Sequence, residues 1–166
     1  MRFHLVDKVT ELIPKQRIVT VKNLTLGEEY LADHFPTFPV LPGVLMLEAL
    51  VQSAAWLIRA SSNFAHSIIV LREARGIKYG SFLEPGQQMT ITIELNGTFD
   101  DPAEMLTFKG TGERGGTNIV SGRLGLARYN LSEKQPHLAK LDQQIIDGYR
   151  QEWARLWHTS QNLQLR

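Results

Sequence analysis

The sequence contains no cysteine. Disulfide frameworks, thiolate metal sites and a cysteine nucleophile are therefore excluded. An excess of charge of one sign is also missing, because 18 Lys and Arg residues face 17 Asp and Glu residues and leave a formal net charge of +1. Such a balance offers no field that would attract nucleic acid or an anionic membrane, so we expect neither as a partner. No internal repeat or low-complexity stretch occurs either.

What the chain does have is the composition of an ordinary globular protein. It has 166 residues, of which 43% are hydrophobic and 21% are charged. This length and composition predict a protein that can bury a sizeable core. The opening residues, Met1 to His4, lack the apolar segment of a signal peptide, and we therefore expect the protein in the cytoplasm.

One apolar run, Val40 to Ile58, is almost long enough to cross a bilayer. Glu48 lies in its middle and Gln52 follows, and a central carboxylate is expensive in lipid, so we expect no membrane span. The run instead predicts a helix buried on all sides within a protein. Pro42 suits the first position of this helix, and we expect its end near Ser61.

Five other segments read as strands because they are rich in β-branched residues or alternate between apolar and polar positions. The clearest alternation runs from Gln88 to Leu95, and the pair Gly115-Gly116 predicts a hairpin. One long helix among antiparallel strands predicts an α+β domain in which a curved sheet wraps the helix, and free strand edges favour a dimer. The predicted strands are Arg17–Leu26, Ser67–Ala74, Gln88–Leu95, Met105–Glu113 and Asn118–Tyr129.

The composition changes after Tyr129. Apolar residues then recur at steps of three and four, which predicts an amphipathic helix that packs on the domain or on a partner subunit. We therefore divide the chain into a domain over residues 1–130 and a helical extension over 131–166. The apolar residues of the extension are Leu138, Leu141, Ile145, Tyr149, Trp153 and Leu156.

Candidate catalytic groups gather between residues 34 and 52. Glu48 is the one acidic residue between Asp33 and Glu73, and its place in an apolar helix favours the protonated form, which can act as a general acid. Gln52 follows four residues later, on the same helix face, and can hydrogen-bond and orient the Glu48 carboxyl. A buried Glu that is merely satisfied by Gln52, with no catalytic task, remains an alternative.

His34 lies at the start of a proline-rich loop and could act as a base near neutral pH. Between His34 and Glu48 stands Pro42-Gly43-Val44. The missing Cβ of Gly43 lets a ligand approach the free backbone N–H groups at the helix start, which can hold a developing oxyanion. A base, an oxyanion donor and an acid therefore follow one another along a short segment.

These residues resemble the signature of the β-hydroxyacyl-acyl-carrier-protein dehydratases of fatty-acid synthesis. The signature reads His-Phe-Pro, two variable residues, Pro, two more, Pro-Gly-Val-Leu, two more, then Glu-Ala. Residues 3–9 also resemble the opening strand of that family, and the likeness extends over roughly residues 1–130. The matching positions are His34, Phe35, Pro36, Pro39, Pro42, Gly43, Val44, Leu45, Glu48 and Ala49.

The resemblance implies a hot-dog fold and the formation of a trans-2-enoyl thioester and water from a (3R)-hydroxyacyl chain on acyl carrier protein. It implies His34 as the base, Glu48 as the acid and Gly43 as the donor to the thioester carbonyl, with Val44, Gln52 and Phe35 at the substrate. It implies no cofactor and no metal. It further implies a homodimer, or a trimer of such dimers, in which His34 and Glu48 of one site come from opposite subunits.

Some positions depart from the family pattern. Thr37 stands where the family often has Gly, and Gln87 replaces the aspartate of a Pro-Gly-Asp turn. The surface that would meet an acidic carrier protein is less basic than in the family, and we expect it to bind such a carrier less strongly. Two alternatives to the dehydratase remain: a hot-dog thioesterase that uses Glu48 as base or nucleophile, and a non-catalytic acyl-binding subunit.

Overall fold

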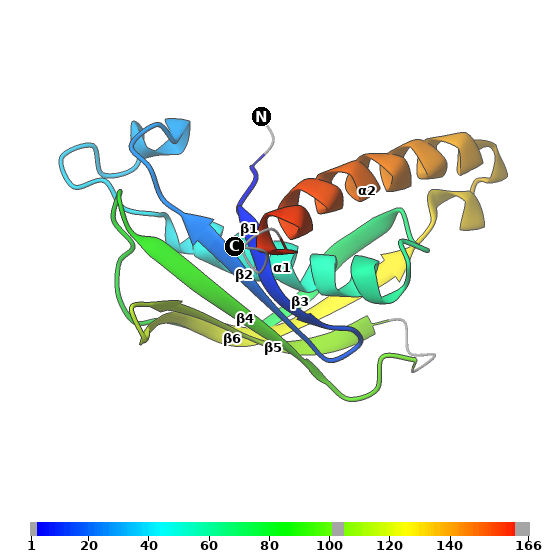
Figure 1. Cartoon of the computed structure of the whole chain (residues 1–166), viewed down its shortest axis with the longest axis horizontal. Helices are drawn as coiled ribbons and strands as arrows, with labels where there is room; N and C mark the ends of the chain where they lie inside the picture. Colours follow the sequence, from blue (N-terminus) through cyan, green and yellow to red (C-terminus); the bar gives the residue numbers. More distant parts are fainter. Residues whose placement is uncertain (1–2, 101–104, 162–166) are drawn as a thin grey trace.

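A six-stranded antiparallel sheet curves around one long helix, and a second helix crosses the open side (Figure 1). The computed structural model describes residues 3–100 and 105–161, with side chains as far as Trp157. The strand order is β1-β2-β4-β5-β6-β3, so β1 and β3 form the two edges of the sheet. The strands are β1 (Lys8–Ile13), β2 (Arg17–Asn23), β3 (Ile68–Tyr79), β4 (Gln88–Asn96), β5 (Met105–Arg114) and β6 (Thr117–Tyr129).

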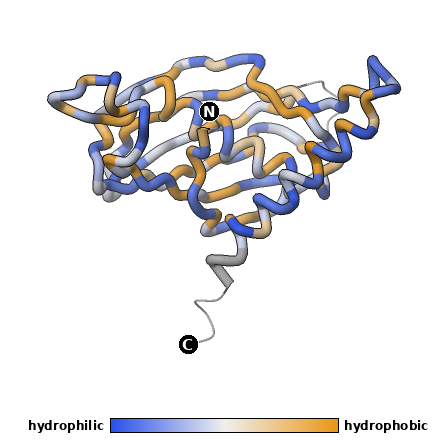
Figure 2. Tube along the Cα trace, turned by 90° about the horizontal axis from the view of Figure 1, so that it is seen from above, coloured by the Kyte–Doolittle hydropathy of each residue, from blue (hydrophilic) through white to orange (hydrophobic). Residues whose placement is uncertain are grey.

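The predicted alternation of β4 is confirmed. Met89, Ile91 and Ile93 are fully buried, and the intervening residues are less so, because successive side chains of a strand point to opposite faces. The predicted hairpin between β5 and β6 is also confirmed. Gly115 and Gly116 both have positive φ angles, 55° and 82°, as the tight turn requires. Hydrophobic and hydrophilic residues accordingly follow one another at short intervals along the chain trace (Figure 2).

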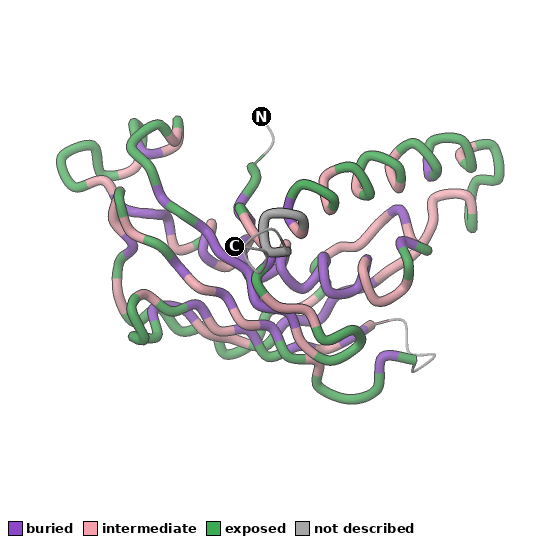
Figure 3. The backbone as a smooth tube through the Cα atoms, viewed as in Figure 1, coloured by how far each residue is buried: buried purple, intermediate pink, exposed green. Residues whose placement is uncertain are grey.

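Helix α1 (Gly43–Ser61) lies in the hollow of the sheet. Pro42 is its N-cap, so the helix begins one residue later than the sequence predicts, and it ends at Ser61 as expected. The expectation of burial on all sides is wrong for the first half of the helix. Val44 is 70% exposed and Glu48 is half-buried, whereas most residues from Ala49 onward are buried (Figure 3).

Two strands lie elsewhere than predicted. The first spans Lys8–Ile13 rather than residues 3–9, although the amide of Asp7 already donates to the carbonyl of Val21 (2.8 Å). Strand β3 continues to Tyr79, five residues beyond the predicted end. Its second half is largely exposed at an edge of the sheet, so its sequence lacks the apolar alternation that marks a half-buried strand.

Helix α2 (Ala139–Gln161) lies over the second half of α1 (Figure 1). Trp153 is the centre of its contact, with ring centroids 5.8 Å from Trp56 and 6.4 Å from Phe64. The predicted apolar face is confirmed for most of its residues, since Leu156 joins the main core and Tyr149 and Trp153 pack against it, whereas Leu141 is 42% exposed. The last five residues of the predicted extension, 162–166, lie outside the described part.

Helix α1 is long and apolar enough to cross a membrane by length and composition alone. However, 61% of the apolar window is buried inside the protein, where it forms the centre of the core. This is the pattern of a core helix.

Candidate active site

Glu48 projects from the middle of α1 beside Gln52, as the four-residue spacing predicts. The Nε2 of Gln52 donates to Oε1 of Glu48 (3.0 Å) and to the carbonyl of Phe3 (2.9 Å). The amide of Leu5 donates to the side-chain oxygen of Gln52 (3.0 Å). Because a backbone N–H can only donate, this last bond fixes which end of the Gln52 amide faces Glu48.

Gly43 begins α1 and leaves free amides at the helix start. Within the described part of the chain, neither the Gly43 nor the Val44 amide has a hydrogen-bond acceptor, as expected for the first residues of a helix. A Cβ at Gly43 would stand 3.2 Å from the ring of Tyr79, at the end of β3. Glycine therefore keeps Tyr79 and the helix start in close contact and leaves the amides approachable.

The loop before α1 carries His34 and lies at the opposite end of the molecule from the start of α2 (Figure 1). His34 is half-buried and its ring stacks at a tilt on Phe35, with 4.4 Å between centroids. Phe35 has a positive φ of 49°, a rare conformation for a side chain of this size. The amide of Phe38 donates to the Phe35 carbonyl (2.8 Å) and closes the turn.

Several large apolar side chains around this loop face solvent. Phe38 meets Phe82 edge-on, with centroids 5.7 Å apart, although both are half-exposed. A cluster of exposed aromatic side chains on one protein is typical of an interaction surface. The members with their exposed fractions are Phe35 59%, Phe38 50%, Val44 70%, Tyr79 51% and Phe82 54%.

Glu48 opens into a cavity of about 230 Å³. Its walls come from α1, from the segment before β1 and from α2, and Val51, Ala55 and Trp56 supply apolar surface. His4 is the histidine that lines this cavity, and its Nδ1 lies 3.0 Å from Glu152 of α2. His34 does not line it. The structure therefore brings Glu48 and Gln52 together and leaves His34 apart from them within one chain.

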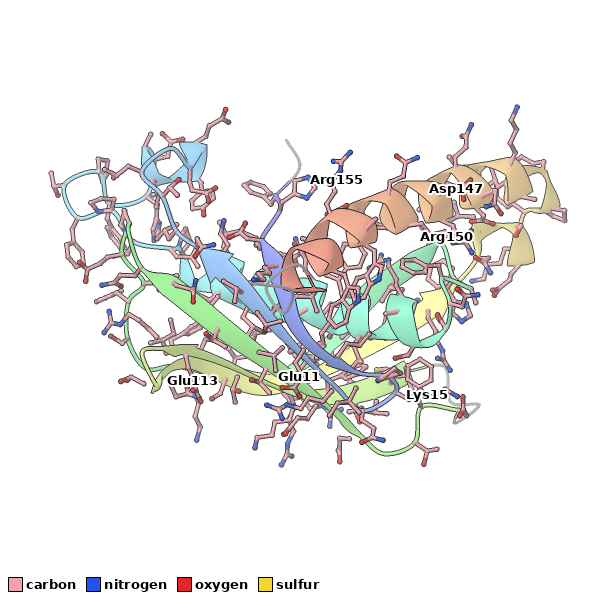
Figure 4. All side chains as sticks on the ribbon, viewed as in Figure 1. Glu11, Lys15, Glu113, Asp147, Arg150 and Arg155 are labelled. Carbon is pink, nitrogen blue, oxygen red and sulfur yellow. The ribbon has the colours of Figure 1, made fainter. Side chains whose placement is uncertain are left out.

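The part of the cavity beyond Glu48 was not predicted from the sequence. Arg59 and Tyr149 line it, and the guanidinium carbon of Arg59 lies 3.7 Å from the centre of the Tyr149 ring. A signal was present, since residues 48, 52, 55 and 59 share one helix face at steps of four and three. The charged residues labelled in Figure 4, among them Asp147 and Arg155 on α2, lie away from this cavity.

Among the described residues, no group of three or more His, Asp or Glu is arranged to hold a metal ion. The cavity offers the Glu48 carboxyl, the Gln52 amide, the His4 imidazole and the Arg59 guanidinium, and the free backbone amides of Gly43 and Val44 lie at the start of the same helix.

The sequence around this site matches a known protein family. The model of the FabA-like domain matches residues 1–123. The chain belongs to this family. The match includes the His34 loop, Glu48 and all strands but the end of β6, and it stops before α2.

Curated relatives of this FabA-like chain align over its central part. A 3-hydroxyacyl-acyl-carrier-protein dehydratase FabZ from Polynucleobacter asymbioticus is 39% identical over 93 residues, which cover 56% of this chain and 62% of that protein. A FabZ from Pediococcus pentosaceus is 40% identical over 89 residues, covering 54% of this chain and 60% of that protein. The chain thus spans about three-fifths of the length of these relatives.

Solved structures identify the fold of this FabA-like domain as the hot dog. The dehydratase heterocomplex ApeI:P from Xenorhabdus doucetiae matches with a TM-score of 0.64 and 19% identity, over 82% of this chain and 90% of that one. A hypothetical thioesterase with coenzyme A from Streptococcus pneumoniae matches with a TM-score of 0.56 and 10% identity, over 73% and 86%. Identities this low establish the fold alone.

Proposed function

We propose that the protein is a (3R)-hydroxyacyl thioester dehydratase, with His34 as base and Glu48 as acid. The observation that carries the proposal is the arrangement at α1: Gln52 orients the Glu48 carboxyl in a cavity with both apolar and polar walls, and the unpaired amides of Gly43 and Val44 lie at the start of the same helix. The names of the FabZ relatives support the same reaction.

The reaction follows from the chemistry of these groups. The Gly43 amide donates to the thioester carbonyl and stabilises the negative charge that develops there. His34 takes the α-proton, the C–O bond at the β-carbon breaks, and Glu48 protonates the departing hydroxyl, which leaves as water. A double bond forms between the α- and β-carbons. The thioester itself acidifies the α-carbon, so the step needs no cofactor or metal. Val44 and Phe35 would contact the thioester end of the substrate.

A complete site in this proposal requires two subunits. Within one chain the cavity at Glu48 lacks His34, so a second copy must supply the base. Strand β3 offers the means, because this strand of 12 residues has a neighbour, β6, on one side only. An unpaired edge strand is a template for pairing with another chain. The exposed aromatic side chains beside Gly43 and His34 would then be covered by the partner, and such dimers could assemble further into a trimer of dimers.

We assign acyl carrier protein as the bearer of the acyl chain and the cytoplasm as the location. The carrier is the one that the names of the relatives give. The domain boundary near residue 130 also belongs to this proposal, with residues 131–166 as an addition to the catalytic domain.

The test measures two products at once. Wild-type protein, His34→Ala and Glu48→Gln are each incubated with a 3-hydroxyacyl thioester, and enoyl absorbance and free thiol are followed. We expect enoyl formation by the wild type and a loss of about 100-fold or more in each variant, since a positioned acid or base contributes on that order. Free thiol without enoyl would instead identify a thioesterase.

His4→Ala separates the two histidines. His4 lines the cavity of Glu48 in the same chain, so it is the competitor to His34 for the role of base. The proposal expects His4→Ala to keep most of its enoyl-forming activity. Loss of activity in His4→Ala with retention in His34→Ala would overturn the assignment of the base. Binding of acyl thioesters without either product, by a folded protein, would leave an acyl-binding subunit.

A further inference from the structure

The cavity at Glu48 continues into a larger one. A second cavity, of about 460 Å³, lies between the beginning of β3, the end of α1 and α2. Four residues line both cavities: Arg59, Ile69, Tyr149 and Glu152. The two spaces are therefore adjacent, one beside the Glu48 carboxyl and the other beside α2, and together they are called the channel.

Arg59 lies at the junction of these two cavities. The residue is only 6% exposed, and its Nε has no hydrogen-bond partner. No hydrogen bond or ion pair joins its guanidinium to any residue of the described part. Its contacts are aromatic: the guanidinium carbon is 3.7 Å from the Tyr149 ring centre and 5.4 Å from that of Trp56.

A buried cation without an anion is an unusual arrangement. Charged side chains are rarely buried unless they are paired, because removal from water penalises the charge. Burial lowers the pKa of Arg59, with Tyr149 and Glu152 acting in the opposite direction, yet a guanidinium stays protonated in proteins. Ring faces attract a cation, but they leave its N–H donors unused. The donors of Arg59 therefore have an unfilled capacity inside the channel.

Glu152 is the carboxylate that this chain itself could offer. It is near enough to favour the charged form of Arg59. Its Oε1, however, lies 3.0 Å from Nδ1 of His4, within hydrogen-bond distance, and its side chain is 26% exposed. The pairing with His4 holds Glu152 at the wall of the channel and leaves Arg59 without a direct partner.

The position of Arg59 relative to Glu48 suits the two ends of one acyl chain. The residues are eleven positions apart on the same face of α1, which corresponds to about 16 Å along the helix axis. Val51, Ala55 and Trp56 form apolar wall between them. A channel with a reactive carboxyl at one end, apolar walls and a cation at the other end matches a chain with an apolar middle and an anionic far end.

We propose that Arg59 binds a carboxylate at the far end of the acyl chain, so that the substrates are 3-hydroxyacyl thioesters of dicarboxylic acids. This inference rests on the proposed dehydratase function. Arg59 acts as a specificity-determining residue, and its planar fork of N–H donors suits a carboxylate. The apolar part of the channel contributes equally to binding plain and carboxylated chains.

The test compares matched pairs of 3-hydroxyacyl thioesters of equal length, one ending in a methyl group and one in a carboxylate. Wild-type protein should favour the carboxylated member by about tenfold or more in kcat/KM, the order expected for one charge-assisted hydrogen-bonded pair. Arg59→Met should remove this preference mainly through KM and leave the plain substrate little changed. Arg59→Lys, which keeps the charge but not the fork, should retain part of it. Arg150→Met on the exposed side of α2 is the matched control.

Two outcomes would overturn the proposal. The first is a wild-type preference for the methyl-ended chain. The second is an equal loss for both substrates in Arg59→Met, which would assign Arg59 to the packing of α2 on α1.

A binding measurement separates this inference from the proposed reaction. Calorimetry with saturated thioesters that lack the hydroxyl group, again in carboxylated and plain pairs, requires no turnover. Tighter binding of the carboxylated member, lost in Arg59→Met, would support the role of Arg59 even if no enoyl product ever forms. Equal affinity for both members in the wild type would refute it whatever the activity.

Discussion

Gln52 links the acid to the segment before the first strand. Its amide nitrogen donates both of its protons, one to Glu48 and one to the Phe3 carbonyl. The Glu48 oxygen that faces Gln52 must therefore accept, and in the proposed reaction the other oxygen would carry the proton that is transferred. Gln52 is in this account a positioning residue rather than a proton donor.

Replacing Gln52 with Leu should lower kcat by about tenfold, the order of one hydrogen bond to a charged or reacting group. KM should change less, because Gln52 acts on the carboxyl and not on the acyl chain. Gln151→Leu on the exposed side of α2 serves as the control. An unchanged kcat in Gln52→Leu, or a loss that falls on KM alone, would contradict the positioning role.

Lys22 is another buried cation, but unlike Arg59 it is paired. It is 2% exposed, and its Nζ lies 2.6 Å from Glu28 and 3.9 Å from Asp7. Lys22→Met should reduce the free energy of unfolding by about 2–3 kcal/mol, because Glu28 and Asp7 lose their counter-ion in a partly buried place. The exposed pair of Lys15 and Asp100 offers a comparison, and Lys15→Met should cost less than about 1 kcal/mol. Equal losses of unfolding free energy in Lys22→Met and Lys15→Met, measured with urea, would show that burial does not strengthen the interaction of Lys22 with Glu28 and Asp7.

Helix α2 contains a glycine in its interior. A Cβ at Gly148 would meet no heavy atom within 4 Å, and the residue lines the larger cavity without filling it. Gly148→Ala should therefore raise the free energy of unfolding by about 0.5–1 kcal/mol through helix propensity alone. Gly86→Ala, at a turn with a φ of +86°, should lower it by about 1–2 kcal/mol. Thermal unfolding of both variants tests whether the free energy of unfolding rises in Gly148→Ala and falls in Gly86→Ala.

Asp142 fastens the beginning of α2 to the rest of the molecule. Burial disfavours its charge, but hydrogen bonds from Ser67, Ser132 and the amide of Leu131 outweigh burial and lower its pKa to about 2. Because the pKa in the folded state is below the ordinary 3.8, the stabilisation is complete above pH 3.8 and is lost as the pH falls toward 2.

Asp142→Asn should therefore lower Tm at neutral pH, and its difference from the wild type should shrink as the pH falls from 3.8 to about 2. Asp147→Asn, on the exposed side of the same helix, should change Tm little at any pH. A difference between Asp142→Asn and wild type that stays constant down to pH 2 would contradict the account of how α2 is held.

The elements whose burial follows a short period were predictable from the sequence. Strand β4 alternates because one face meets α1, and this pattern is local. The second half of β3 was not predictable from the sequence, because an exposed edge strand carries no alternation of apolar and polar residues. The buried face of α2 follows the predicted apolar spacing from Tyr149 to Leu156, but in the first turn Asp142 rather than Leu141 turns inward to accept a hydrogen bond from Ser67, which is distant in the sequence.

The candidate site was predictable where spacing along one helix decides it. Glu48 and Gln52 meet because they are four residues apart. The degree of burial of Glu48 was not predictable, because it depends on which half of α1 is covered by α2 and the sheet. The burial of Arg59 was not predictable for a related reason. A cation in the last turn of a helix is ordinary, and its burial arises only when α2 packs over it.

The whole molecule combines a covered edge and an open one. Strand β1 lies against α2, while β3 has no neighbour on its outer side within the described chain. The aromatic side chains beside His34 and Gly43 are exposed at the same time. Both features are explained if two copies pair through β3 and each completes the other's site. A monomer would then hold an acid without its base.

Mixing two inactive variants tests this account most directly. His34→Ala and Glu48→Gln proteins are combined, dissociated and allowed to re-associate, and enoyl formation is measured against each variant alone. The account predicts recovery of about a quarter of wild-type activity, because half of the dimers are mixed and each mixed dimer has one intact site of two. No recovery from folded, re-associated protein would contradict a dehydratase site shared between subunits.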